Sequence, residues 1–347
     1  MRKETPAPTA AEVRANHRER REFVKGVAAL TGAAWLSSYM KSAAAEPPPE
    51  TTTIRIVDTE ITCIAPQIVA QELLYAEGFR EVKYLKWGRD TQHFPPEDTL
   101  AGEADIGFSF SPTDILFIDS GSPVLILAAA HTGCVELFAN ERIRSTRDLK
   151  GKNVATFADT KVFISMFAAY VGLNPEKDIN WVPVRLEERV RLFEEGKIDA
   201  FMSGPPDAIE LRRKRIGHTL VNTTVDKPWS QYSCCLISST KEFVRRNPVA
   251  TKRALRAILK SVDLCAQDPE GVARKIADRG IWDHDLTLDW LRELPFGKWR
   301  EIDVANSVRF WALRLHDVGA IKGSPQRIIQ QGTDLRFLNE LKRELKA

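Results

Sequence analysis

Short apolar runs alternate with amphipathic segments along most of the chain, which predicts strands and helices in turn. The apolar runs predict strands at Ile54–Val57, Val82–Trp87, Ala104–Phe108, Val124–Ala130, Asn153–Phe157, Trp181–Val184 and Ile198–Met202. Helical spacing of apolar positions predicts helices at Pro66–Ala76, Pro95–Gly102 and Glu187–Glu194, and from Ser111 and Thr160 onward. This alternation is typical of an α/β fold with mostly parallel sheets.

The pattern becomes almost wholly helical from Pro248 onward. Helices are predicted at Val249–Cys265, Asp268–Ala277, Leu286–Leu294 and Val304–His316. At 347 residues the chain is longer than one typical domain and suits two compact lobes, each with its own core. The sequence therefore predicts two α/β lobes with a helical C-terminal part.

The N-terminus has the features of an export signal. Arg20 and Arg21 precede the moderately apolar run Gly26–Leu36, and small residues for cleavage follow at Ser42–Ala45. The arginine pair resembles the twin-arginine type of signal, and the apolar run is too short to span a bilayer. We expect residues 1–45 to be a signal peptide, residues 46–53 to be an extended leader, and the periplasm to be the destination. The alternative is a retained membrane anchor.

Charge excludes one class of partner. Through residue 45 the chain carries eight Lys and Arg against four Glu, a balance of +4, and the whole chain carries +3. The remainder is therefore close to −1 and has no global attraction for nucleic acid or for an anionic membrane surface. No nucleic-acid partner is expected.

The cysteines show no metal-binding spacing. The five are Cys63, Cys134, Cys234, Cys235 and Cys265. None forms a CxxC or CxxxC motif, so the sequence predicts no metal site. Cys234 and Cys235 fall in an apolar run that predicts a strand, where neighbouring side chains point to opposite faces. We expect these cysteines to be small buried hydrophobic residues.

Four short motifs in order resemble transporter-linked periplasmic binding proteins. They are Leu100–Gly107 (LAGEADIG), Ser145–Lys152 (STRDLKGK), Gly172–Asp178 (GLNPEKD) and Glu195–Ala200 (EGKIDA). Together with the order of the elements, they resemble the nitrate/sulfonate/taurine branch, which includes binders of thiamine-pyrimidine precursors. The resemblance covers roughly Ile54–Leu315. In both Gly-x-x-Asp motifs, a helix-ending glycine leads directly into a buried strand, so Asp105 and Asp199 are expected to be structural. Asp148 is expected to cap or to stabilise a loop.

The resemblance implies an architecture and a function. The expected fold is the type II periplasmic-binding-protein fold, in which hinge strands near Val135–Ala139 and Leu236–Thr240 join the two lobes. Lobe 1 would comprise residues 54–135 and 240–347, and lobe 2 residues 136–239. The implied function is solute binding for an ABC uptake transporter. The protein would be a monomer that holds a small organic ligand between its lobes and delivers it to a permease with its ATPase. No cofactor is implied.

Ligands of such folds bind beyond the carboxyl ends of strands and at helix N-termini. This rule nominates ligand-binding residues in the loops at those positions: Cys63, Ser109, Phe110, Ser111, His131, Thr132, Thr160, Lys161, Pro205 and Trp229. Several have an alternative structural role. Ser111 and Thr160 suit helix caps (for Ser111 with Pro112 as the first helical residue), His131 suits a structural hydrogen bond, and Trp229 suits packing inside a lobe.

The sequence leaves three ligand classes possible: a sulfonate, an aromatic acid and a pyrimidine-like ring. Lys161 and His131 would suit a sulfonate, whereas Asp159 would oppose an anion unless it faces away. Phe110 and Trp229 would suit an aromatic acid or a pyrimidine-like ring by stacking.

An enzyme on the same fold is the alternative function. The thiamine-pyrimidine synthases would imply a run of cysteines and an active-site histidine, and Cys234–Cys235 is only a vicinal pair. A Cys134 nucleophile with His131 three residues earlier lacks an evident orienting acid or oxyanion motif. We therefore assign no catalytic residue and expect a protein that is not an enzyme. A periplasmic sensor domain would share the fold and differ only in its partner.

Overall fold

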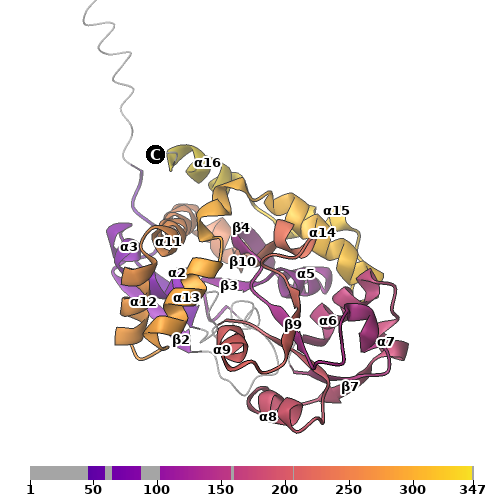
Figure 1. Ribbon diagram of the computed structural model, residues 1–347. Coiled ribbons are helices and arrows are strands. Elements are labelled where there is room, and N and C mark those ends of the chain that lie inside the picture. The colour runs from indigo at the N-terminus through magenta and orange to yellow at the C-terminus, as the bar shows by residue number, and fades with distance from the viewer. Residues whose placement is uncertain (1–45, 59–64, 87–101, 158–159, 206, 346–347) are drawn as a thin grey trace, which may run out of the picture. The chain divides into compact units, whose positions relative to one another are not determined.

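The computed structural model in Figure 1 describes residues 46–58, 65–86, 102–157, 160–205 and 207–345. All its helices and strands lie within the unit Pro48–Ala347. The predicted signal peptide, most of the predicted helix Pro95–Gly102, and Cys63 lie outside the described residues.

The first sheet combines strands from two distant parts of the chain. Its strands are β1 (Thr53–Asp58), β2 (Glu81–Lys86), β3 (Ile106–Phe110), β4 (Val124–Thr132) and β10 (Ser233–Thr240), in the order β2-β1-β3-β10-β4. Strand β1 is parallel to β2 and β3, whereas β10 is antiparallel to β3 and β4. The sheet is therefore mixed, because β10 enters it from the second sheet.

Helices α2 (Ala65–Val69), α3 (Gln71–Ala76) and α5 (Ser111–Asp119) connect the strands of the first sheet. The single helix predicted at Pro66–Ala76 is observed as α2 and α3, which are interrupted at Ala70. The prediction of a Ser111 cap is wrong: Phe110 is the N-cap residue of α5, and the Ser111 hydroxyl instead donates to the Ser233 carbonyl, 2.7 Å away.

The second sheet is built from one continuous stretch of chain. Its strands are β5 (Glu136–Ala139), β6 (Asn153–Thr156), β7 (Asn180–Pro183), β8 (Ala200–Ser203) and β9 (His218–Asn222), in the order β7-β6-β8-β5-β9. Helices α6 (Thr160–Tyr170), α7 (Pro175–Asp178), α8 (Arg189–Glu194) and α9 (Asp207–Lys214) accompany it, with short 3-10 turns at Thr146–Leu149 and Leu186–Glu188. The apolar pattern of the sequence does not predict β9.

The C-terminal part is helical, as predicted. It contains α10 (Lys241–Arg246), α11 (Pro248–Gln267), α12 (Pro269–Asp278), α13 (His284–Glu293), α14 (Val304–Asp317), α15 (Pro325–Gly332) and α16 (Arg336–Glu344). Pro248 and Pro269 are the first residues of α11 and α12. Proline suits this position because a backbone N–H there would have no acceptor within the helix. Even the longest of these helices, α11, carries charges along its 20 residues, and no helix in the described ranges could span a membrane.

The two Gly-x-x-Asp motifs have the same structural role, one in each sheet. Asp105 accepts the Arg55 backbone N–H at 2.8 Å, and its own N–H donates to the Arg55 carbonyl at 2.8 Å. Asp199 repeats this exchange with Asn153, at 3.0 Å and 2.6 Å. Asp105 thus joins the start of β3 to β1, and Asp199 joins the start of β8 to β6, so the prediction that both are structural is confirmed. Asp148 forms a capping box with Ser145, also as predicted.

The chain passes between the sheets twice. It leaves β4 at Thr132 and enters β5 at Glu136, and it returns from β9 through a turn containing Trp229 into β10. Gly133 in the first crossing has φ +61° and approaches Thr223 and Thr224 of the second crossing. The two crossings therefore lie side by side. The lobe boundaries at residues 135 and 239 stay a prediction.

Candidate functional site

Strand ends from both sheets converge on the crossings. Because β10 is antiparallel to β3 and β4, its first residues pair with their carboxyl ends: Ser233 is opposite Thr132, and Cys235 is opposite Phe110. In the second sheet, Glu136 at the start of β5 is opposite Ser203 at the carboxyl end of β8. The loops at the carboxyl ends of β3, β4, β6 and β8 are therefore the natural place for a bound solute.

The first sheet contributes a buried segment at the carboxyl end of β3. Ser109 and Phe110 are 7% and 6% exposed, and Ser111 is fully buried. The Phe110 ring lies edge-on to Phe163 of α6, with 5.5 Å between ring centroids. Phe110 therefore links the end of β3 to the first helix of the second sheet, and its ring edge is already occupied by a protein side chain.

Asp114, in the first turns of α5, is a fully buried carboxyl group. Burial raises its pKa from 3.8 to about 7, and the nearby Ser109 and Ser238 hydroxyls moderate that rise. No hydrogen bond to the carboxyl oxygens has normal geometry within the described structure. Folding therefore favours the neutral acid.

We expect Asp114→Asn to stabilise the protein in a pH-dependent way. Below pH 3.8 the wild-type carboxyl is neutral in both states, and the advantage of Asn from this source is absent. Between pH 3.8 and 7 the unfolded state loses its proton first, so wild-type stability falls; above about 7 the loss is complete. Above pH 7 the resulting difference in unfolding free energy between Asp114→Asn and the wild type is on the order of 4 kcal/mol. Urea unfolding at several pH values measures it, with exposed Glu194→Gln as control. A pH-independent difference would contradict the assignment.

Trp229 belongs to an aromatic cluster between α6 and α14. Its ring is 4.7 Å from Phe167, 5.7 Å from Phe310 and 5.7 Å from Trp311, centroid to centroid. The residue is 4% exposed. Of the two roles considered for Trp229, the structure shows the packing role.

Thr160 and Lys161 begin α6 but are occupied locally. The Thr160 hydroxyl donates to the Phe157 carbonyl at 2.7 Å and accepts the Phe157 N–H at 3.0 Å. The Lys161 ammonium lies 2.9 Å from a Glu176 carboxylate oxygen and 5.5 Å from the Trp181 ring centroid. Lys161 is therefore held by the surface around α7, on the side of β7.

Arg189 is a buried cation that the sequence analysis missed. It begins α8 after β7, and its guanidinium donates to the Leu186 carbonyl and to the Asp207 carboxylate at the start of α9. It also lies 5.7 Å from the centroid of the Phe157 ring, which follows β6. Its side chain is only 7% exposed, and its Nε has no hydrogen-bond partner among the described residues. Arg189 therefore sits where the carboxyl ends of β6, β7 and β8 meet.

Ser203 is the last residue of β8, at the carboxyl end of the second sheet. Its hydroxyl is buried and likewise has no partner in the described ranges. Gly204 and the half-buried Pro205 follow, and the Gly204 carbonyl accepts the Ala208 N–H at 2.9 Å. Two buried donors, Arg189 Nε in α8 and the Ser203 hydroxyl in β8, therefore have no acceptor among the described residues. Arg189 stands in a short helix with several other charged residues, so the sequence carries no signal that sets it apart.

Ion pairs join α9 to α13. Arg212 lies 2.6 Å from Glu293 and 3.5 Å from Glu136, and Arg213 pairs with Asp289. The buried Glu136 carboxylate accepts the Thr219 hydroxyl at 2.7 Å. Burial raises the pKa of Glu136, against the lowering effects of Thr219 and Arg212. These contacts connect the second sheet to the C-terminal helices.

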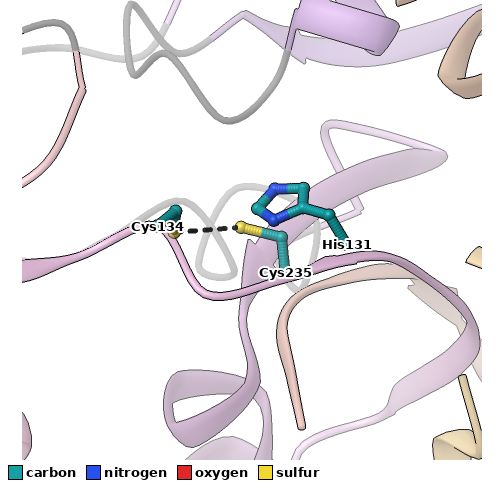
Figure 2. Close-up of side chains that lie close together, drawn as sticks. All are labelled: His131, Cys134 and Cys235. Carbon is teal, nitrogen blue, oxygen red and sulfur yellow. Dashed lines mark hydrogen bonds between the residues drawn. The ribbon is translucent and has the colours of Figure 1, made fainter. Parts of the chain in front are cut away.

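His131 and three cysteines meet at the crossings, and Figure 2 shows His131 with two of them, Cys134 and Cys235. His131 is fully buried in β4, and its Nδ1 lies 2.9 Å from the Gly133 carbonyl. The Cys134 sulfur is 2.8 Å from Cys234 and 3.9 Å from Cys235. The prediction that Cys234 and Cys235 are buried is confirmed. The expectation of opposite faces is wrong, because a bulge in β10 shifts the register on either side of Cys235 and breaks the alternation.

Thr132, half-buried at the end of β4, pairs with Ser233 in the sheet. The structure thus brings Ser109, Phe110, Ser111, His131 and Thr132 to the first sheet's edge and Thr160 and Pro205 to the second's. It assigns Lys161 and Trp229 to other surroundings, and Cys63 lies outside the described residues.

The family model described as NMT1/THI5 like matches residues 64–272. No protein among those with curated function matches the sequence. The fold resembles the periplasmic nitrate-binding protein NrtA from Synechocystis PCC 6803, with a TM-score of 0.71 at 17% identity over 86% of this chain and 90% of that one. It also resembles a putative periplasmic sulfonate-binding protein, SsuA from Methylobacillus flagellatus KT (TM-score 0.65, 20% identity, 86% and 96% covered). A third similar structure is the alkanesulfonate-binding protein SsuA from Xanthomonas axonopodis pv. citri bound to MOPS. Its TM-score is 0.61 at 16% identity, over 80% of this chain and 97% of that one.

Proposed function

This chain belongs to the NMT1/THI5-like family and has the periplasmic-binding-protein fold, and from this premise we propose that it is the solute-binding component of an ABC uptake transporter. It captures a small organic ligand between the two sheets and releases it to a permease with its ATPase. The named structural neighbours, which bind nitrate or sulfonates, support this role. The chain acts as a monomer in the periplasm, which it reaches by the twin-arginine pathway.

The ligand is an organic anion, either an alkyl sulfonate or an aromatic acid. The observation that carries this class is Arg189, a buried guanidinium at the carboxyl edge of the second sheet with one donor unused in the described structure. A buried arginine favours a planar or tetrahedral oxyanion, since its fork of N–H groups matches the oxygen spacing. A neutral pyrimidine could accept one hydrogen bond from this donor through a ring nitrogen, but it carries no negative charge to match the buried cation.

Asp207 fixes the guanidinium without saturating it. Its carboxylate binds Nη2, and its own side chain is 53% exposed, so water already screens the negative charge. The unused Nε and the buried Ser203 hydroxyl remain available on the same edge of the sheet. We propose that the anionic group of the ligand accepts from both. The organic part extends toward the Phe110–Ser111 segment of the first sheet, so that the two sheets share the ligand.

A thermal-shift screen tests this proposal. The panel pairs each alkyl sulfonate and aromatic acid with an uncharged analogue of the same carbon skeleton. A ligand at 100 times its Kd stabilises the folded state by about 2.7 kcal/mol, which raises Tm by about 5 °C in a protein of this size. We expect anions to raise Tm and their uncharged partners to have no effect. Equal shifts from both members of every pair would contradict the anion assignment.

A further inference from the structure

We propose that Cys134, Cys235 and His131 form a binding site for a thiophilic divalent metal ion such as Zn²⁺. One ligand atom from each residue lies within 4.8 Å of the other two, and all three residues are buried. Figure 2 shows the two sulfurs and the imidazole ring directed toward a common space. The site shares no residue with the proposed anion contacts of Arg189 and Ser203, although Cys235 pairs in the sheet with Phe110, and it does not depend on the identity of the solute.

The sulfur spacing matches metal coordination. Four-coordinate zinc with Zn–S bonds of about 2.3 Å places two sulfur ligands about 3.8 Å apart. Cys134 and Cys235 are 3.9 Å apart. The 2.8 Å between Cys134 and Cys234 is too short for two ligands of one metal ion. The geometry therefore selects Cys235, and not its neighbour, as the second thiolate.

The histidine is oriented for the same task. A carbonyl oxygen can only accept a hydrogen bond, so the 2.9 Å contact between Nδ1 and the Gly133 carbonyl places the ring proton on Nδ1. Nε2 then keeps the lone pair that a metal ion requires. Metal-ligating histidines commonly hold their other ring N–H on a backbone carbonyl in this way. The Phe296 ring, 5.1 Å away, packs edge-on against the imidazole and limits its rotation.

Charge balance favours a divalent ion. Two thiolates and a neutral imidazole carry −2, and a buried site of this kind is stable only when a cation cancels that charge. A divalent ion leaves no net charge, whereas a monovalent ion leaves −1. The three residues would supply three ligands, and water or a small ligand would complete a four-coordinate site. Because His131 lies in β4, Cys134 in the first crossing and Cys235 in β10, the ion would join the first crossing to the strand that follows the second crossing.

The test titrates Co²⁺ into the fully reduced full-length protein and records the thiolate-to-cobalt absorption in the near ultraviolet. We expect one Co²⁺ per chain, visible bands typical of tetrahedral cobalt, and displacement by Zn²⁺. Cys134→Ser and Cys235→Ser should each weaken Co²⁺ binding at least about 100-fold. Cys265→Ser, at a buried cysteine of α11, is the matched control and should bind normally. Cys234→Ala should also bind normally, because its sulfur is not a ligand.

A second measurement needs no variant and covers the case in which a serine variant fails to fold. Native mass spectrometry of the Zn²⁺-loaded wild type should show a gain of one zinc ion less two protons, the mark of two thiolates. A folded, reduced wild type without a thiolate–cobalt band would overturn the proposal. So would a band that survives in folded Cys235→Ser but is lost in Cys234→Ala. Recovery of a Cys134–Cys234 disulfide that forms even in reductant, with no metal bound, would overturn it as well.

Discussion

Replacing Arg189 with Gln lowers the affinity for the anionic ligand at least about 100-fold, because a buried charge-assisted hydrogen bond to the anion is lost. The glutamine amide ends where the arginine Nε lies, so the substitution removes the positive charge and both Nη atoms, which donate to Leu186 and Asp207. A neutral amide N–H can still donate from that position, but without the charge that strengthens a hydrogen bond to an anion. Isothermal titration calorimetry with the best anion from the thermal-shift panel measures the change.

The matched control separates ligand binding from stability. Arg191 lies two residues further along α8, is exposed, and pairs with Glu188 and Glu195 on the outer surface. Arg191→Gln should leave ligand affinity unchanged. If folded Arg189→Gln binds the ligand as tightly as Arg191→Gln, Arg189 only braces Asp207 and the anion binds elsewhere.

Gly133→Ala should destabilise the fold by more than about 3 kcal/mol. Gly133 has φ +61°, and a Cβ atom there would lie 2.3 Å from the Thr224 Cα and 2.5 Å from the Thr223 carbonyl oxygen. Both contacts are backbone, so neither can be relieved by a side-chain rotation. The substitution forces the two crossing segments apart and disturbs His131 and Cys134 on either side. Urea unfolding measures the loss.

Gly280→Ala is the control for the backbone conformation alone. Gly280 has φ +66° after α12, and a Cβ atom there would meet nothing within 4 Å. Alanine at this position should lower the unfolding free energy only by the cost of placing a Cβ-bearing residue in the left-handed conformation, about 1–2 kcal/mol. Equal losses at Gly133 and Gly280 would show that the crossings are loosely packed and can separate without cost.

The sequence was sufficient to predict features set by local periodicity. Most strands of both sheets, the helices α11 to α14 and the roles of Asp105, Asp148 and Asp199 follow from short-range patterns of apolar residues, caps and turns. The break at Ala70 and the cap of α5 were not predicted. In α5, the Ser111 hydroxyl donates to the Ser233 carbonyl instead of capping the helix. Ser233 is 122 residues away, so local sequence patterns do not predict this hydrogen bond.

The site depends on contacts between distant segments, which local sequence patterns do not encode. Lys161 was nominated because it opens a helix, but Glu176 and Trp181 hold its ammonium. Arg189 is not predicted as a binding residue because its neighbours in the sequence are charged. The fold shows that its side chain is buried near the carboxyl ends of β6, β7 and β8. Cys134 and Cys235 are 101 residues apart, so their spacing carried no metal signal.

The central claim is that this chain binds an organic anion reversibly and does not transform it. Calorimetric titration of the wild type with the best anion, followed by chemical analysis of the recovered ligand, tests this most directly. We predict saturable binding of one ligand per chain and complete recovery of the unchanged ligand. Conversion of the ligand into a product during the titration would contradict the claim and identify an enzyme on this fold.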